Sequence, residues 1–420
     1  MNKPKEVLKD FTKNSSFCAA PWLHYYRSPI GEVAACCISD PLSPQLKLKT
    51  FEEIINSEEY KKLRLQMMNG VLPKECHLCE KSNNNIIYKD NVNEFLEGMK
   101  PKILENTLDD GTINLDPVFL DFRFLDCNIT CNTCNPDYSS SWLKKINKVE
   151  SSEAYNLKLQ ENLQDTSFFE DEYSRVINNF QWQRIYFAGG EPLMKKNHLK
   201  ILEELKEKPF HADLKIFYNT NLSIGKTLLK NWLELLAHFK EVHLNVSIDS
   251  FGKFNDLIRE GSSFEKICSN LDFIVFHKPS NLNLKIDLTI TSLFFYNIFE
   301  FSEWILKNKY SLNARAMNEF GYLGAFLRPE VLKISFRKKV FLQWSEWYCT
   351  LGLEDQDRLK NLFEVMTMFH AEPEFNEDMK KEVQKHIQET LKYELIDLNH
   401  FIKFNMKQDL CVDINGIVNV

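Results

Sequence analysis

The stretch Cys127-Asn128-Ile129-Thr130-Cys131-Asn132-Thr133-Cys134 places three cysteines on one short loop. Three residues separate the first pair and two separate the second. The preceding residues, 118–125, are apolar and β-prone, which predicts a strand that ends at this loop. Thiolates grouped in this way are typical metal ligands. Three of them can hold three corners of a metal cluster and leave the fourth corner open to another ligand.

Composition and charge indicate a large protein with a sizeable core. The chain has 420 residues, enough for two or three domains, and 44% of them are apolar. The net charge of −7 disfavours nonspecific binding to a polyanion such as RNA. No run approaches the roughly 18–20 apolar residues of a membrane span, and the N-terminus lacks a signal-peptide pattern. These features predict a cytoplasmic location, where eleven cysteines favour metal or redox chemistry over disulfides.

A second group of cysteines precedes the loop. Apolar alternation around the turn 29–31 predicts a hairpin, and a helix is expected over 51–68, with Thr50 as its N-cap. A C-x2-C pair follows this helix. Four thiolates suit a tetrahedral site, and the residues alone leave zinc, an iron–sulfur cluster and buried metal-free cysteines as alternatives. The candidate ligands are Cys18, Cys36 or Cys37, Cys76 and Cys79.

From residue 118 the pattern changes to strands that alternate with amphipathic helices. This order predicts a parallel sheet, and six or so units favour an α/β fold built on a partial (β/α)6 barrel. A small N-terminal cysteine-rich hairpin–helix domain precedes it, and a helical C-terminal region follows. The expected domains are 1–95, 96–325 and 326–420. The expected strands lie at 118–124, 184–188, 214–219, 243–249, 285–291 and 312–317.

Helices are expected between these strands and after them. The helices of the barrel are expected at 168–180, 196–207, 225–239, 264–276 and 297–308. Residues 81–115 resemble a linker with helical pieces. In the C-terminal region, helices are expected at 336–351, 359–368 and 379–404. They are interpreted as packing helices that cover the barrel, with recruitment of a macromolecular partner as the alternative.

Polar residues or glycines follow the first five predicted barrel strands. Chemistry in such barrels collects where strands end, so these residues are site candidates. Gly189 and Gly190 allow the backbone to approach a ligand closely, and Glu191 can accept hydrogen bonds from a cationic amine. The other candidates are Pro192 in the same turn, Asn219 and Asn221 after the third strand, Ser247 and Asp249 at the fourth, and Arg259 shortly afterwards.

Two motifs in this order carry a resemblance to a known family. Cys127-x3-Cys131-x2-Cys134 after one strand, followed by Gly189-Gly190-Glu191-Pro192 after the next, resembles the radical S-adenosylmethionine (radical SAM) superfamily. The N-terminal segment 17–80 is similar to the cluster-binding half of SPASM or twitch domains, although it precedes the barrel where those domains usually follow it. Its five cysteines favour a single auxiliary cluster, for which Cys36 is preferred to Cys37 because of its spacing from Gly31.

The resemblance implies a cofactor set and a reaction. Cys127, Cys131 and Cys134 would bind a [4Fe-4S] cluster whose open iron binds S-adenosylmethionine (SAM), and the N-terminal cysteines would bind an auxiliary [4Fe-4S] cluster. The motif 189–191 would contact the methionine amine, and the remaining polar candidates the ribose or carboxylate. Reductive cleavage of SAM would give a 5′-deoxyadenosyl radical that abstracts hydrogen from a peptide or small-metabolite substrate.

The resemblance also implies partners for the protein, and two alternative functions are considered beside it. The implied partners are the substrate and a reductant such as flavodoxin or ferredoxin, with no membrane and no nucleic acid. An RNA-modifying radical SAM enzyme is the first alternative, and the acidic charge balance counts against it. The second alternative is a zinc-ribbon interaction protein whose thiolates are purely structural.

Overall fold

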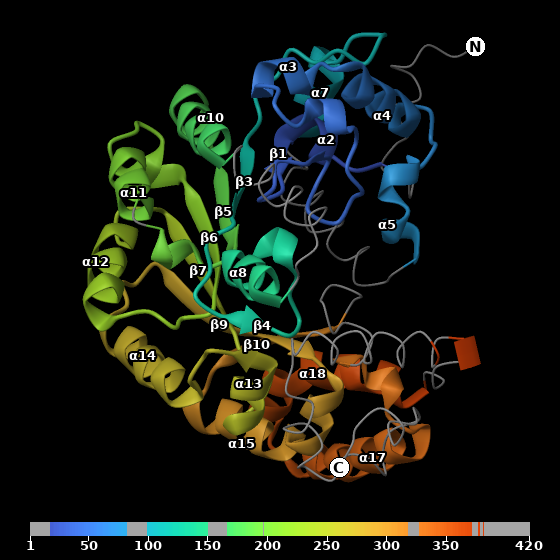
Figure 1. The fold of residues 1–420 in the computed structure, drawn as a ribbon, viewed down its shortest axis with the longest axis vertical. Helices are drawn as coiled ribbons and strands as arrows, with labels where there is room; N and C mark the ends of the chain where they lie inside the picture. The colour runs from blue at the N-terminus through green and yellow to red at the C-terminus, as the bar shows by residue number, and fades with distance from the viewer. Residues whose placement is uncertain are drawn as a thin grey trace.

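An eight-stranded sheet forms the centre of the molecule (Figure 1). The computed structural model describes residues 17–81, 99–149, 166–195, 197–317 and 327–371, together with 377, 378 and 381. All neighbouring strands pair in parallel except the first two in the chain, which form an antiparallel hairpin. In sheet order the strands are β10 (Ser311–Ala316), β9 (Leu282–Ile290), β7 (Glu241–Ser247), β6 (Lys215–Thr220), β5 (Arg184–Gly189), β3 (Phe119–Phe124), β1 (His24–Arg27) and β2 (Val33–Ala34).

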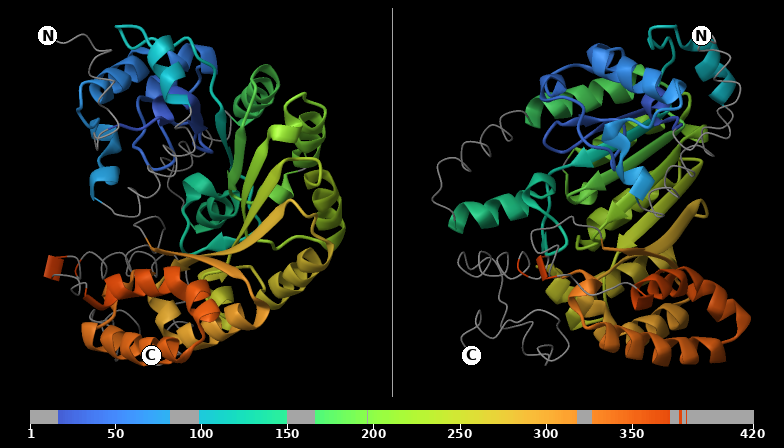
Figure 2. Two further views of the ribbon diagram at one scale, coloured as in Figure 1. Left: turned by 180° about the vertical axis from the view of Figure 1, so that it is seen from behind. Right: turned by 90° about the vertical axis from the view of Figure 1, so that its right-hand side faces the viewer.

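Six of these strands, β3 to β10 without the short β4 and β8, form the partial barrel that the sequence predicts. The sheet curves, and the helices that connect its strands lie along its convex side (Figures 1 and 2). The α/β fold class is therefore confirmed. These helices are α10 (Thr166–Asn179), α11 (His198–Lys206), α12 (Lys226–Leu236), α14 (Phe264–His277) and α15 (Ile298–Asn308).

The alternation of residues along each strand explains why one face of the sheet is apolar. In β7, Val242, Leu244 and Val246 are buried in the main core beneath the helices, whereas the residues between them are only half buried. Alternate side chains of a strand point to opposite faces, so the second set faces the concave side. We call this concave, mostly polar side of the six barrel strands the inner face.

The N-terminal unit is joined to the barrel by a strand. Hairpin β1–β2 turns at 28–32, where Gly31 has a positive φ of 88°, and β1 pairs in parallel with the barrel strand β3. A small second core contains apolar residues of 17–68 together with Ile103, Ile113 and Val118. The cysteine-rich unit therefore extends the barrel sheet directly.

The helix expected over 51–68 is two helices. α3 (Phe51–Ile55) ends at Asn56, and α4 (Glu58–Met68) begins after Ser57, whose side chain accepts a hydrogen bond from the Tyr60 amide. A serine at this position competes for backbone hydrogen bonds and favours a new N-cap, so a single helix was the wrong prediction. Thr50 is the N-cap of α3 as predicted, and Glu53 completes a capping box, because its carboxylate accepts a hydrogen bond from the Thr50 amide (2.8 Å).

Two C-terminal helices pack beside β10. The expected helices 336–351 and 359–368 correspond to α17 (Ile334–Thr350) and the longer α18 (Leu353–Ala371), and α18 contacts β10. The Trp344 indole donates to Ser302 Oγ of α15 (3.0 Å), which attaches this pair to the barrel. The helix expected at 379–404 lies outside the described residues. No helix in the described part of the chain has the length and apolarity needed to cross a membrane.

Candidate metal and cofactor site

The three-cysteine loop lies at the C-terminal end of β3 and is held by α8 (Ser140–Val149). The Cys127 amide donates to Ser140 Oγ (3.1 Å), and Ser141 Oγ donates to the Cys127 carbonyl (2.6 Å). The Trp142 indole donates to the Cys131 carbonyl (2.8 Å). Each of these three contacts uses a backbone group of the loop and leaves the thiol uninvolved.

A short ribbon holds the other side of the loop. β4 (Thr130–Cys131) pairs antiparallel with β8 (Arg259–Glu260), which follows α13 (Lys253–Ile258). Asn132 adds two hydrogen bonds to the end of α13, from its amide to Ile258 O (2.8 Å) and from Nδ2 to Leu257 O (2.9 Å). Residues far apart in sequence thus clamp the middle of the cysteine loop.

Arg259 brings a positive charge to the middle cysteine. Its Nη1 donates to Cys131 Sγ (3.6 Å), and its Nε pairs with the Asp249 carboxylate (2.9 Å). Asp249 is fully buried and also accepts a hydrogen bond from the Thr289 amide (3.0 Å). We propose that Asp249 positions Arg259 against Cys131, and the predicted ligand contacts of both residues stay predictions.

Burial keeps these thiols protonated in the absence of metal. It raises the pKa of Cys134 to about 12 and that of Cys131 still further, although Arg259 lowers both. Cys127 also raises the thiol pKa of both, and Cys134 raises that of Cys131, which indicates that the three thiols are neighbours. Metal ligation needs thiolates, so the charge of a bound metal must offset this burial.

The glycine pair allows close packing of the protein's own backbone. Gly189 has a φ of 101°, and a Cβ built there would lie 2.3 Å from Phe124 O. A Cβ on Gly190 would lie 2.1 Å from Asp126 O, directly before the cysteine loop. The predicted close approach is therefore made to the end of β3, which fixes where the loop begins.

We expect Gly190→Ala to destabilise the protein, because the methyl group requires the backbone at Asp126 to move. Overpacking of this kind costs about 3 kcal/mol, which corresponds to a fall in Tm of roughly 5–10 °C. Thermal denaturation followed by circular dichroism measures it. Gly225→Ala is the matched control, since a Cβ there meets nothing within 4 Å and it should shift Tm little. Equal Tm values for the two variants would contradict the packing argument.

Glu191 links the ends of two barrel strands. Its buried carboxylate accepts hydrogen bonds from Thr220 Oγ1 (2.8 Å), the Asn221 amide (2.6 Å) and the Leu193 amide (3.2 Å). Burial raises the pKa of Glu191 to about 7, while these hydrogen bonds lower it. All three donors belong to the chain, and we propose that Glu191 fixes the turn 189–192 against β6. Its contact with a ligand amine stays a prediction.

Asn221 connects this turn to the cysteine loop. Its Nδ2 donates to Asn128 Oδ1 (2.8 Å) and lies 4.0 Å from Cys127 Sγ. Asn219 and Ser247 face the inner side of the sheet, where Asn219 Oδ1 accepts a hydrogen bond from Asn245 (3.0 Å). These three residues are therefore brought toward the site, and Pro192 is buried in the turn.

The N-terminal cysteines form a second group. Cys36 and Cys76 are buried, and burial raises the thiol pKa of both, that of Cys76 to about 12. Cys18 raises both pKa values further, and Cys79 raises that of Cys76, so these four thiols are neighbours. Cys37 interacts electrostatically with Arg123 and Tyr186 of the barrel as well.

The donor atoms at both groups fit an iron–sulfur cluster. Within the described residues, no three His, Cys, Asp or Glu side chains converge closely enough to hold a single metal ion. A four-iron cluster separates its ligands further than one ion does, and sulfur ligands without histidine or carboxylate are its usual set. Neighbouring thiols on an anchored loop meet this requirement.

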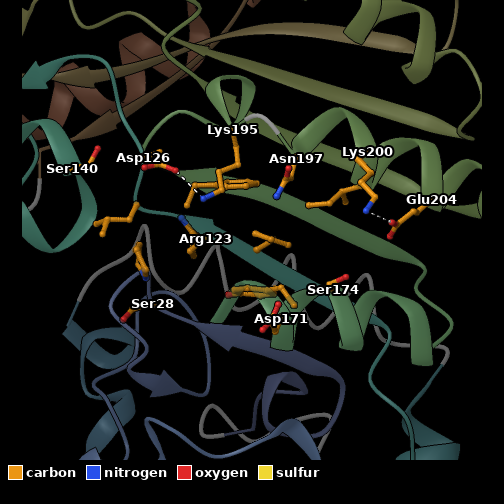
Figure 3. Close-up of a pocket in the computed structure, with 16 residues that line it drawn as sticks. Ser28, Arg123, Asp126, Ser140, Asp171, Ser174, Lys195, Asn197, Lys200 and Glu204 are labelled. Atoms are coloured by element: carbon orange, nitrogen blue, oxygen red, sulfur yellow. Dashed lines mark hydrogen bonds and ion pairs between the residues drawn. The ribbon is translucent and has the colours of Figure 1, made fainter. Parts of the chain in front are cut away.

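A separate cavity of about 360 Å³ lies beside the cysteine loop (Figure 3). Its lining comes from the end of β3, the hairpin tip, α10 and α11, and an ion pair between Lys195 and Asp126 (3.0 Å) lies at one side. Its described lining residues include no cysteine. The cavity adjoins the cysteine loop through Ser140, whose Oγ accepts a hydrogen bond from the Cys127 amide.

Sequence reasoning missed the residues that support the loop. The serines that begin α8 carry no motif. Arg259 is a site candidate in the sequence, but its pairing with the cysteine loop has no sequence signal, because it joins segments far apart in the chain. Asn128 is a weak signal, since it lies inside the motif as a polar residue between two cysteines.

Comparisons with known proteins agree with this arrangement. The family model described as the radical SAM superfamily matches residues 124–275, and the SPASM model, described as an iron–sulfur cluster-binding domain, matches residues 18–80. No curated protein sequence matches the chain.

Solved structures with similarity include native anSMEcpe with bound AdoMet, at 17% identity and a TM-score of 0.37, covering 56% of this chain and 61% of that one. Another is Streptococcus suis SuiB bound to the precursor peptide SuiA, at 14% identity and a TM-score of 0.35, covering 70% of this chain and 60% of that one. The chain thus spans about 60% of the length of these structures.

Proposed function

We propose that this chain, which is a radical SAM enzyme with a SPASM domain ahead of its barrel, reductively cleaves SAM and abstracts hydrogen from a second substrate. When bound, the cluster would supply one electron that breaks a carbon–sulfur bond of the SAM sulfonium, which gives methionine and a 5′-deoxyadenosyl radical. The second substrate is a peptide or a small metabolite, and the electron comes from a small reductant protein such as flavodoxin or ferredoxin.

The observation that carries this proposal is the anchored cysteine loop. Cys127, Cys131 and Cys134 are neighbouring thiols at the end of the first barrel strand, and the described contacts of the loop are made mainly through its backbone. The thiols are thus available as ligands. Three protein ligands leave one cluster corner for SAM, which is the arrangement that this chemistry needs.

The remaining residues hold this arrangement in place. We propose that Glu191 and Asn221 keep the ends of β5 and β6 against the loop, and that Arg259 offsets charge at Cys131. Their burial also excludes water and stray hydrogen donors from the loop, which protects a reactive radical. The polar inner face of the barrel strands offers hydrogen-bonding groups to the second substrate.

The auxiliary group is proposed to take part in the same reaction. Cys18, Cys36, Cys76 and Cys79 would hold a second cluster in the SPASM domain, which is joined to the barrel through the pairing of β1 with β3. A cluster at this place could accept an electron from a substrate radical or bind the substrate.

Anaerobic reconstitution with iron and sulfide tests the proposal. We expect brown protein with about eight irons per chain and formation of 5′-deoxyadenosine from SAM after reduction with dithionite. A colourless protein that retains zinc and ignores SAM would contradict the proposal and support a zinc-ribbon interaction protein. If RNA stimulated SAM cleavage and no peptide or metabolite did so, the RNA-modifying alternative would be supported.

A further inference from the structure

The inner face is divided into two layers. Nearer the N-terminal ends of the strands, flat side chains stack across neighbouring strands, as Arg184 does between Phe119 (4.6 Å) and Phe217 (3.8 Å). His24 extends this row on Phe119 (4.2 Å between ring centroids), and His243 extends it on Phe217 (4.4 Å). The faces of these side chains are covered by their stacking partners. A ligand would therefore contact the second layer, which lies nearer the cysteine loop.

That second layer contains two arginine–carboxylate pairs, one on β3 and one on β9 and β10, at the two ends of the row of six barrel strands. On β3, Arg123 pairs with Asp121 (2.6 Å) and lies over the rings of Tyr26 (5.6 Å) and Tyr186 (4.9 Å). Only 12% of the Arg123 side chain is exposed. The guanidinium of Arg123 is therefore held by Asp121 and the two tyrosine rings, and little of it is exposed to a ligand.

Arg315 on the last strand is different. Its Nη2 pairs with the buried Asp287 carboxylate (2.9 Å), and its Nε donates weakly to Thr289 Oγ1 (3.4 Å). Asp287 Oδ1 also accepts a hydrogen bond from Asn313 (2.6 Å), so that carboxylate is satisfied. Among the described residues, Arg315 Nη1 makes no hydrogen bond, and 49% of the side chain is exposed.

Arg315 lies opposite Thr289 of β9 in the strand register, and the Thr289 amide donates to the Asp249 carboxylate (3.0 Å). Asp287 raises the pKa of Arg315 most, and Tyr186 and Asp249 raise it as well, while Arg259 lowers it. Arg315 therefore lies within electrostatic reach of the pair that contacts Cys131. A second exposed cation, Lys285, lies on the same face of β9 and has no ion pair in the described part of the chain.

We propose that Arg315 is a carboxylate-binding residue of the inner face, which holds either the methionine carboxylate of SAM or a carboxylate of the second substrate. A guanidinium offers paired N–H donors that match a carboxylate. Asp287 fixes one edge of this guanidinium and leaves the other edge for a ligand. The arrangement also explains why Arg259, whose donors contact Asp249 and Cys131, need not bind the SAM carboxylate. The proposal rests on the proposed function for the identity of SAM.

Equilibrium binding to reconstituted, unreduced enzyme separates the two sources. In the first arm, SAM and its decarboxylated analogue are titrated into the wild type, Arg315→Gln and Arg315→Lys. If Arg315 holds the methionine carboxylate, R315Q should weaken SAM binding by about tenfold or more, with little change for the analogue. R315K should recover part of the loss.

The second arm uses two capped pentapeptides, Ala-Ala-Glu-Ala-Ala and its Gln counterpart, added to SAM-loaded enzyme and followed by saturation-transfer NMR. If Arg315 holds a substrate carboxylate, the wild type should favour the Glu peptide and R315Q should lose that preference while binding SAM normally. Lys230→Gln, on the exposed side of α12, is the control for the loss of one positive charge.

Three results would overturn the proposal. R315Q could match the wild type in both arms, the decarboxylated analogue could weaken as much as SAM, or K230Q could reproduce the effect. Both arms avoid reduction, so a wild type that forms no deoxyadenosine would contradict the proposed activity alone. A wild type that binds no SAM would also count against that activity, and the peptide arm, repeated without SAM, would still test Arg315.

Discussion

Cys131→Ala is expected to abolish 5′-deoxyadenosine formation. Cys131 is the middle ligand candidate, its backbone is held by β8 and Trp142, and its thiol is the one that Arg259 contacts. Its removal leaves two thiols at the loop, too few to retain a cluster with one open corner. We expect the variant to fold, since the backbone contacts do not use the thiol, and to lose about four of eight irons.

Deoxyadenosine is measured by chromatography after reduction with dithionite in the presence of SAM, and iron is measured on the same sample. Cys268→Ala is the matched control, because this half-buried cysteine lies on α14 and packs against the main core. It should keep its iron and its activity. Deoxyadenosine formation by C131A at the wild-type rate would show that the loop does not hold the reactive cluster.

Much of the barrel could be predicted because its signals are local. Runs such as 243–249 combine β-prone residues with a change from apolar to polar at the strand end, and each is followed by an amphipathic helix. The six predicted barrel strands all occur, with ends that differ by a few residues, as 285–291 does from β9 (Leu282–Ile290). The cysteine spacing is equally local.

The support of the site could not be predicted because it depends on contacts between distant segments. Arg259 reaches Cys131 only because β8 pairs with β4, and nothing in either dipeptide predicts a strand. Glu191 was assigned to a ligand from its place in a motif, whereas its hydrogen bonds to Thr220 and Asn221 require the parallel pairing of β5 with β6. The direct joining of β1 to β3 carries no sequence signal either.

The two adjacent cysteines of the hairpin face different surroundings, which separates the candidates for the auxiliary ligand. Burial raises the pKa of the Cys36 thiol most, and Cys37, Cys18 and Cys76 raise it as well. Cys37 interacts with Tyr26, Tyr138, Arg123 and Tyr186, on the side of the barrel. We therefore propose that Cys36 completes the auxiliary set and that Cys37 faces the inner side of the sheet.

Cys76→Ala is accordingly expected to remove the auxiliary cluster and spare the first one. Iron should fall from about eight to about four per chain, deoxyadenosine should still form without coupling to a substrate, and conversion of the substrate should stop. Cys37→Ala is the matched variant from the same unit and should retain about eight irons. If C76A kept its full iron content, or if C37A lost iron as C76A does, the proposed ligand set would be wrong. If C76A lost four irons yet still converted substrate, the second cluster would have a structural role, and the radical chemistry would depend on the loop at 127–134 alone.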